Sequence, residues 1–60
     1  MTEIVIDPKI RHGKPIIKGT RIAVDEILGA LAGGMIFEEI ENEYGVTKDG
    51  ILAAIKYSKK

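Results

Sequence analysis

The sequence predicts a mainly α protein, a homeodomain-like tri-helical helix-turn-helix fold that carries a short N-terminal β arm. Two observations favour this fold. Residues 25–58 contain three stretches with helical spacing of apolar side chains, separated by glycines. Residues 1–24 contain short β-branched segments bounded by Gly and Pro. Since 60 residues make at most one domain, we expect a single domain over 1–60, with the arm at 1–24 and the three-helix core at 25–58.

The arm offers three candidate strands. Residues 3–6 are rich in β-branched side chains and predict a short extended segment. It ends at Asp7-Pro8, because proline biases the preceding residue away from helix. Residues 15–18 and 21–24 flank Gly19-Thr20, and glycine at the first central position is typical of a type II′ hairpin turn. We expect the arm to pack on the helices or to pair with another subunit. The side chains expected in such a dimer interface are those of Ile16, Ile17, Gly19, Thr20 and Ile22.

Three helices are expected in the core. The first begins near Asp25, a good N-cap residue or first-turn acid, and ends at Gly33-Gly34. The second runs from about residue 36 to residue 43, and Gly45 ends it. The third spans residues 48–58 and begins after Thr47, a plausible N-cap. Its inward side is expected to carry Ile51 and Ile55, with Leu52 and Ala54 beside them.

The connection between the second and third helices has the pattern of a helix-turn-helix. That motif uses an apolar residue to end one helix, Gly where the turn needs positive φ, a small apolar plug, a hydroxyl cap and a branched apolar residue four positions later. These roles fall in order on Tyr44, Gly45, Val46, Thr47 and Ile51. Glu41 stands where the motif prefers a small residue. A tri-helical core that never contacts DNA remains the alternative.

If the third helix reads DNA, its outward side chains make the contacts. At 100° per residue, Asp49, Ala53, Lys56 and Lys60 lie opposite Ile51 and Ile55. The lysines can meet phosphate or base edges, and an alanine can touch a thymine methyl. Sequence-specific readout from this helix is expected to be limited, because the outward side has no Arg, Asn or Gln. The candidate DNA contacts are Arg21, Thr47, Lys48, Ala53, Lys56 and Lys60.

Formal charge is zero in total but unevenly distributed. Residues 1–24 carry +3, residues 25–46 carry −6 and residues 47–60 carry +3. Three solvated faces would account for this pattern. The alternative is two basic ends that meet phosphate, with an acidic element facing away. A neutral total argues against strong non-specific binding to nucleic acid.

The sequence favours no enzyme, cofactor or metal site. It has no Cys and one histidine, His12, so thiolate sites are excluded and a zinc site would need an unusual set of carboxylates. Gly13 and Gly19 do not make a phosphate loop, because five residues separate them and no Lys precedes Thr20. Ser58 has no base in reach along the sequence. The four glutamates of residues 38–43 are expected to form a solvated helix face.

Size and hydropathy indicate a cytoplasmic homodimer. A chain of this length buries only about 60% of its unfolded surface, and without disulfides or a metal it is expected to gain stability by oligomerising. The N-terminus lacks the basic start and apolar run of a signal peptide. No apolar stretch approaches the roughly 20 residues of a membrane span.

The motifs resemble a small prokaryotic antitoxin family that is described as VapB-like and was long catalogued as a domain of unknown function. The resemblance rests on the segment from Gly13-Lys14-Pro15 to Gly19-Thr20-Arg21, then Gly34, Glu38-Glu39-Ile40 and residues 51–57. It implies a homeodomain-like tri-helical fold with a β arm, and usually a dimer. It also implies the antitoxin of a type II toxin–antitoxin pair, whose toxin is commonly a PIN-like ribonuclease.

The sequence therefore leaves two functional hypotheses open. The first is a DNA-binding antitoxin and autorepressor, which acts as a homodimer on promoter DNA and has a PIN-like ribonuclease toxin as partner. The alternative is a dimeric protein-interaction module that masks a partner without binding DNA. Neither involves a membrane or a small-molecule substrate.

Overall fold

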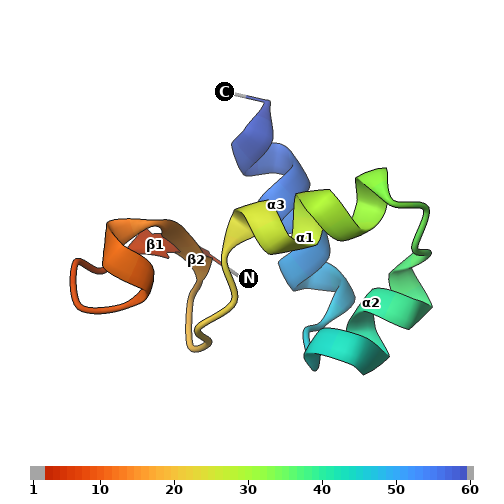
Figure 1. Ribbon diagram of the computed structural model, residues 1–60, viewed down its shortest axis with the longest axis horizontal. Helices are drawn as coiled ribbons and strands as arrows, with labels where there is room; N and C mark the ends of the chain where they lie inside the picture. The colour runs from red at the N-terminus through yellow and green to blue at the C-terminus, as the bar shows by residue number, and fades with distance from the viewer. Residues whose placement is uncertain (1–2, 60) are drawn as a thin grey trace.

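The computed structural model describes residues 3–59. Its elements, in chain order, are β1 (Ile4–Ile6), the 3-10 turn η1 (Arg11–Gly13), β2 (Pro15–Ile17), α1 (Val24–Ala32), α2 (Phe37–Tyr44) and α3 (Lys48–Ser58). The strands lie at one end of the molecule, α1 crosses α3, and α2 lies at the opposite end (Figure 1). The expected composition, mostly helical with a small β part, is confirmed.

The strand pairing differs from the expected one. β2 forms its ladder antiparallel with β1, with Ile4 opposite Ile17 and Val5 opposite Ile16, and not with residues 21–24. The second expected strand is reduced to one bridge between Ile16 and Ala23. The reason is that α1 already begins at Val24, which leaves too little extended chain for a ladder.

The turn after β2 also differs from the expected type. Thr20 N–H donates to Ile17 O (3.0 Å), which puts Gly19 at the second central position with φ +83°. Positive φ at that position is the requirement of a type II turn, whereas type II′ needs it at the first. The Thr20 hydroxyl donates to Ile17 O (2.7 Å) and accepts from Ile22 N–H (3.0 Å). The turn therefore satisfies its own polar groups.

The arm forms part of the hydrophobic core. Ile16 and Ile17 of β2 are 1% and 3% exposed, although they point to opposite faces of the sheet. Ile17 lies against α3, where its methyl carbons come within 3.6 Å of the position that a Cβ on Gly50 would occupy. Ile27, Ile40 and other buried residues of all three helices complete the same cluster. One core thus joins the arm to the helices.

The helix ends follow local sequence signals. Gly34 (φ +94°) follows α1, and Gly45 (φ +70°) follows α2. The N-terminus of α2 is capped from one side: the Glu39 carboxylate accepts from Ile36 N–H (3.0 Å), but the isoleucine side chain has no oxygen to offer in return. The N-cap position of α1 is occupied by Ala23, also without a side-chain bond, and Asp25 lies in the first turn, the second of the two roles expected for it.

The buried face of α3 is rotated from the expected one. Gly50, Ile51 and Ala54 are buried, whereas Ile55 is only half-buried and Leu52 is 43% exposed. The contact with Ile17 explains the rotation, since it turns the glycine side of the helix towards the sheet. Apolar spacing did not reveal this, because glycine contributes no apolar side chain to the pattern.

The loop between the strands is held to α1 by an ion pair. Arg11, His12 and Gly13 all have positive φ (53°, 57° and 80°), so this short turn is left-handed. The Arg11 guanidinium pairs with Glu26, whose Oε1 atom is shielded from solvent. Arg11 is thereby used inside the fold, although it contributes to the basic charge of the arm.

Replacing Gly19 by Val should destabilise the protein by about 1–3 kcal/mol, the cost of holding a β-branched residue in left-handed backbone. No atom lies within 4 Å of a Cβ at this position, so the loss would come from the backbone alone. Gly19→Asn is the control and should cost less, because Asn tolerates this conformation. Urea unfolding measures both. Equal stability of Gly19→Val and the wild type would contradict the turn.

Replacing Gly50 by Ala should stabilise the protein by about 0.5–1 kcal/mol, the usual gain for alanine inside a helix. Its Cβ would meet Ile17 at ordinary van der Waals distance. Gly50→Leu should instead destabilise by about 1–3 kcal/mol, because it would overpack the contact with β2. Gly29→Ala, at an open position of α1, is the matched control for helix propensity. A neutral Gly50→Leu would show that β2 does not pack there.

Candidate nucleic-acid interface

The connection between α2 and α3 is fixed by its own backbone and side chains. Gly45 takes left-handed backbone, and its N–H donates to Glu41 O (2.9 Å). Val46 is buried beneath the turn. The Thr47 hydroxyl accepts from Gly50 N–H (3.1 Å), as expected for the N-cap of α3. The first turn of α3 is therefore held in one orientation relative to α2.

The side of α3 that faces away from the core carries a basic stripe. We call it the α3 outer face, and it consists of Lys48, Asp49, Leu52, Lys56 and Lys59. All five residues are exposed, and three of them are lysines. Lys48 and Lys56 are about 12 Å apart along the helix axis, at 1.5 Å per residue, and Leu52 lies between them. Two cations thus flank one exposed leucine.

Ala53 and Lys60 fall outside this face as the structure describes it. Ala53 is half-buried on the flank of α3, and Leu52 takes the outward position that was expected for the alanine. Lys60 lies outside the described residues. Thr47 is exposed, with its hydroxyl already bonded to Gly50 N–H.

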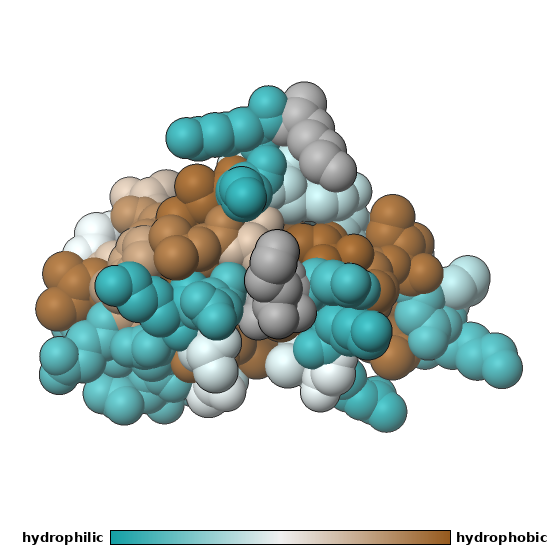
Figure 2. Space-filling view, turned by 180° about the vertical axis from the view of Figure 1, so that it is seen from behind, coloured by the Kyte–Doolittle hydropathy of each residue, from teal (hydrophilic) through white to brown (hydrophobic). Residues whose placement is uncertain are grey.

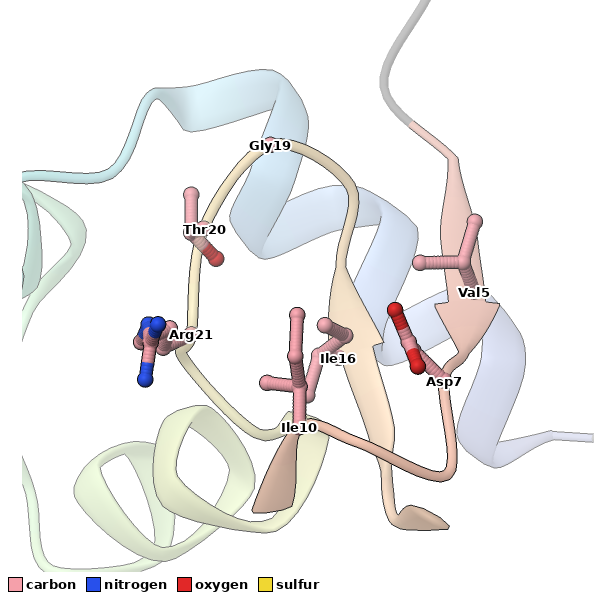
Figure 3. A pocket seen from close by; sticks show the side chains of 7 residues that line it. All are labelled: Val5, Asp7, Ile10, Ile16, Gly19, Thr20 and Arg21. Carbon is pink, nitrogen blue, oxygen red and sulfur yellow. The ribbon is translucent and has the colours of Figure 1, made fainter.

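Arg21 lies at an open hollow in the arm. The hollow has a volume of about 610 Å³ and is lined by Val5, Asp7, Ile10, Ile16, Gly19, Thr20 and Arg21. Figure 3 shows Arg21 and Asp7 on opposite sides, with Ile10 and Ile16 between them. Arg21 thus lines the β side of the molecule.

A different arm residue, Lys18, lies beside the start of α3. A smaller hollow of about 180 Å³ is lined by Lys18 and Thr20 from the arm turn and by Gly45, Val46 and Thr47 from the α2–α3 connection. Lys18 Nζ lies 3.6 Å from Glu3 Oε2, and both side chains are about two-thirds exposed (66% and 65%), so this pair is weak. Sequence reasoning missed Lys18, because only the folded arm brings its turn to α3.

The residues expected in a dimer interface are mostly used within one subunit. Ile16 and Ile17 are buried in their own core, while Thr20 and Ile22 are half-buried in the turn. Gly19 is exposed at its tip. An interface built on the two isoleucines would have to open the fold.

The rest of the surface carries acidic side chains on α2, and large apolar side chains are exposed both there and on the α3 outer face. Glu38, Glu39 and Glu43 of α2 are exposed. The large apolar side chains with the greatest exposure are Ile36 (62%), Ile6 (59%) and Leu52 (43%). Figure 2 shows hydrophobic surface in several separate patches between hydrophilic side chains.

The described residues hold no group of three or more His, Cys, Asp or Glu side chains placed to bind a metal ion. Within residues 3–59, no helix is both long and apolar enough to cross a membrane. The features that this surface offers for binding a partner are the lysines of the α3 outer face and the two hollows of the arm.

Two relatives of the chain are proteins of Mycobacterium tuberculosis (strain ATCC 25618 / H37Rv) and Archaeoglobus fulgidus (strain ATCC 49558 / DSM 4304 / JCM 9628 / NBRC 100126 / VC-16). It is 35% identical over 52 residues to the mycobacterial protein named "Putative antitoxin VapB45", covering 87% of this chain and 22% of that one. It is 60% identical over 25 residues to an uncharacterized archaeal protein, covering 42% of this chain and 69% of that one. The chain thus spans about a fifth of that mycobacterial protein.

The fold and the family comparison agree with these matches. The crystal structure of Rv2018 from Mycobacterium tuberculosis superposes with a TM-score of 0.78 at 35% identity, over 87% of this chain and 24% of that one. Residues 4–58 match the profile of a family described as "Protein of unknown function (DUF433)". The resemblance to VapB-like antitoxins that the motifs indicated is confirmed, and the chain belongs to the DUF433 family.

Proposed function

We propose that this chain is the DNA-binding part of a type II antitoxin, which represses its own promoter as a homodimer. α2 and α3 would act as a helix-turn-helix of homeodomain-like type, with α3 in the major groove. The toxin partner would be a PIN-like ribonuclease encoded beside it. The protein would bind its promoter in the cytoplasm.

The observation that carries the proposal is the α3 outer face. Lys48, Lys56 and Lys59 lie on the solvent side of a helix whose N-terminus is held by Thr47. Phosphates attract lysines in this arrangement, and the positive end of the helix dipole adds to the attraction. Lys18 adds a further cation beside that N-terminus. Leu52, in the middle of the face, would contact thymine methyl groups in place of Ala53.

The relatives support the antitoxin role. The name of the mycobacterial relative states that role, and its 35% identity extends over most of the described fold. The acidic surface of α2 fits the proposal, because it would repel phosphate and so orient the protein with α3 towards DNA.

A protein-interaction module without DNA binding is the second candidate. The observation that favours it is the exposure of Ile6, Ile36 and Leu52, apolar side chains whose burial by a partner would be favourable. The two candidates differ in their response to salt, since apolar contacts release no counterions.

Salt titration of promoter DNA binding, followed by fluorescence anisotropy, tests the proposal. If about three lysines per subunit meet phosphate, a dimer neutralises about six, and log K should fall with log salt at a slope of about −5. Lys56→Ala removes two contacts per dimer and should flatten the slope by about 2.

Two matched variants serve as controls. Lys9→Ala removes the same charge from the arm and should leave the slope unchanged. Glu43→Gln should slightly strengthen binding at an unchanged slope, because it removes a repulsive charge from α2. Absence of binding at about 50 mM salt would reject DNA binding and favour the interaction module. A slope that is indifferent to Lys56 would remove α3 from the contact surface.

A further inference from the structure

Among residues 3–59, β1 has only β2 as a hydrogen-bonded neighbouring strand. One hydrogen bond shows which backbone N–H and C=O groups of β1 face β2. Lys18 N–H donates to Glu3 O (2.8 Å) across the sheet. In an antiparallel ladder alternate residues face the neighbour, so Glu3 and Val5 face β2. The N–H and C=O groups of Ile4 and Ile6 must therefore point away from it.

The neighbouring strand supports this alternation. Ile17 lies opposite Ile4, and its N–H turns away from β1 to donate to Ile22 O (3.0 Å). Pro15 lies opposite Ile6 and has no N–H to offer. Within residues 3–59, no hydrogen bond outside the ladder reaches the backbone of Ile4 or Ile6. Four backbone groups thus form an open edge of β-branched chain, which is a template for another strand.

We propose that this edge is a self-association site, where β1 of a second copy pairs antiparallel about a two-fold axis at Val5. The pairing would join two hairpins into a sheet in the order β2–β1–β1–β2. It rests on the proposed homodimer and specifies its interface. It also replaces the arm residues first expected there, since Ile16 and Ile17 are buried in their own subunit.

Register favours a second copy of the same strand. With Val5 on the axis, Ile4 lies opposite Ile6 of the partner subunit, and the reverse pair also forms. Both are hydrogen-bonded pairs, so all four open backbone groups find partners. A shift of the axis to Ile6 would bring Pro8 of the partner subunit opposite Ile4, and proline has no N–H to donate.

The apolar face of the sheet would be continuous across the axis. Ile4 and Ile6 share the face of Ile17, which lies against α3. Ile6 is 59% exposed, and Ile4 of the partner subunit would cover it. A chain of this size buries only about 60% of its unfolded surface when it folds alone. The apolar area buried between the two subunits would therefore stabilise it further.

Charges at the ends of the strand balance in this register. Glu3 would lie opposite Asp7 of the partner subunit, which alone is unfavourable. Within its own hairpin, however, Glu3 pairs with Lys18, and Asp7 lies one step beyond the last ladder pair on the side of Lys14. Each row across the four strands then contains two lysines and two acids.

Disulfide trapping tests the register. The chain has no Cys, so Val5→Cys introduces a single thiol at the axis. The two copies of residue 5 would form a non-hydrogen-bonded pair of the antiparallel ladder. The Cα atoms of such a pair are about 4.5 Å apart, which is within the range of a disulfide. Mild oxidation should convert most of this variant into a covalent dimer. Ile36→Cys, at a side chain that is 62% exposed and so open to the oxidant, should stay largely monomeric. Equal cross-linking of the two would overturn the register.

Sedimentation equilibrium tests the edge without cross-linking. Ile6→Lys should raise the dimer dissociation constant by about tenfold or more, because a charge on the edge opposes strand addition. Ile36→Lys, the matched change of an equally exposed isoleucine, should leave the constant unchanged, and circular dichroism verifies both folds. A wild-type monomer at about 100 micromolar would overturn the proposal.

The two proposals can fail separately. A monomer that binds promoter DNA would reject the β1 edge and keep DNA binding. A dimer that is weakened by Ile6→Lys but does not bind promoter DNA would support the β1 interface and reject DNA binding.

Discussion

The contact between Ile17 of β2 and the glycine side of α3 is the constraint on which the other features depend. It brings a three-residue strand, too short to be stable alone, into the core of the helices. Ile16 is buried on the opposite face of the same strand, so β2 is enclosed on both sides. The N-terminal segment is thus a structural layer packed on the helices, which is the first of the two arrangements expected for the arm.

Two free surfaces follow from this packing. Since α3 turns Gly50, Ile51 and Ala54 inward, its lysines and Leu52 must face solvent, which creates the proposed DNA surface. Since β2 is enclosed, β1 is the strand whose outer edge remains open. The turn between β2 and α1 also places Lys18 beside Thr47, which joins the arm to the proposed DNA surface.

Local signals in the sequence predicted much of this structure. Gly45 and Thr47 were predicted with their roles, because the backbone of a turn and the cap of a helix depend on adjacent residues. The partner of β2 was not predicted, because residues 3–6 and residues 21–24 both had the composition of a strand. The rotation of α3 and the position of Lys18 depend on contacts between distant segments, which periodicity cannot reveal.

Native-state hydrogen exchange of individual amides tests the central claim that the arm and the helices form one core. The Ile17 amide, which bonds to Ile22 O, reports on β2, and the Ala54 amide reports on the buried side of α3. If they belong to one cooperative unit, their opening free energies should agree to within about 1 kcal/mol. An Ile17 amide that exchanges nearly as fast as in an unfolded chain, beside a protected Ala54, would show that the arm is detached and would contradict the account.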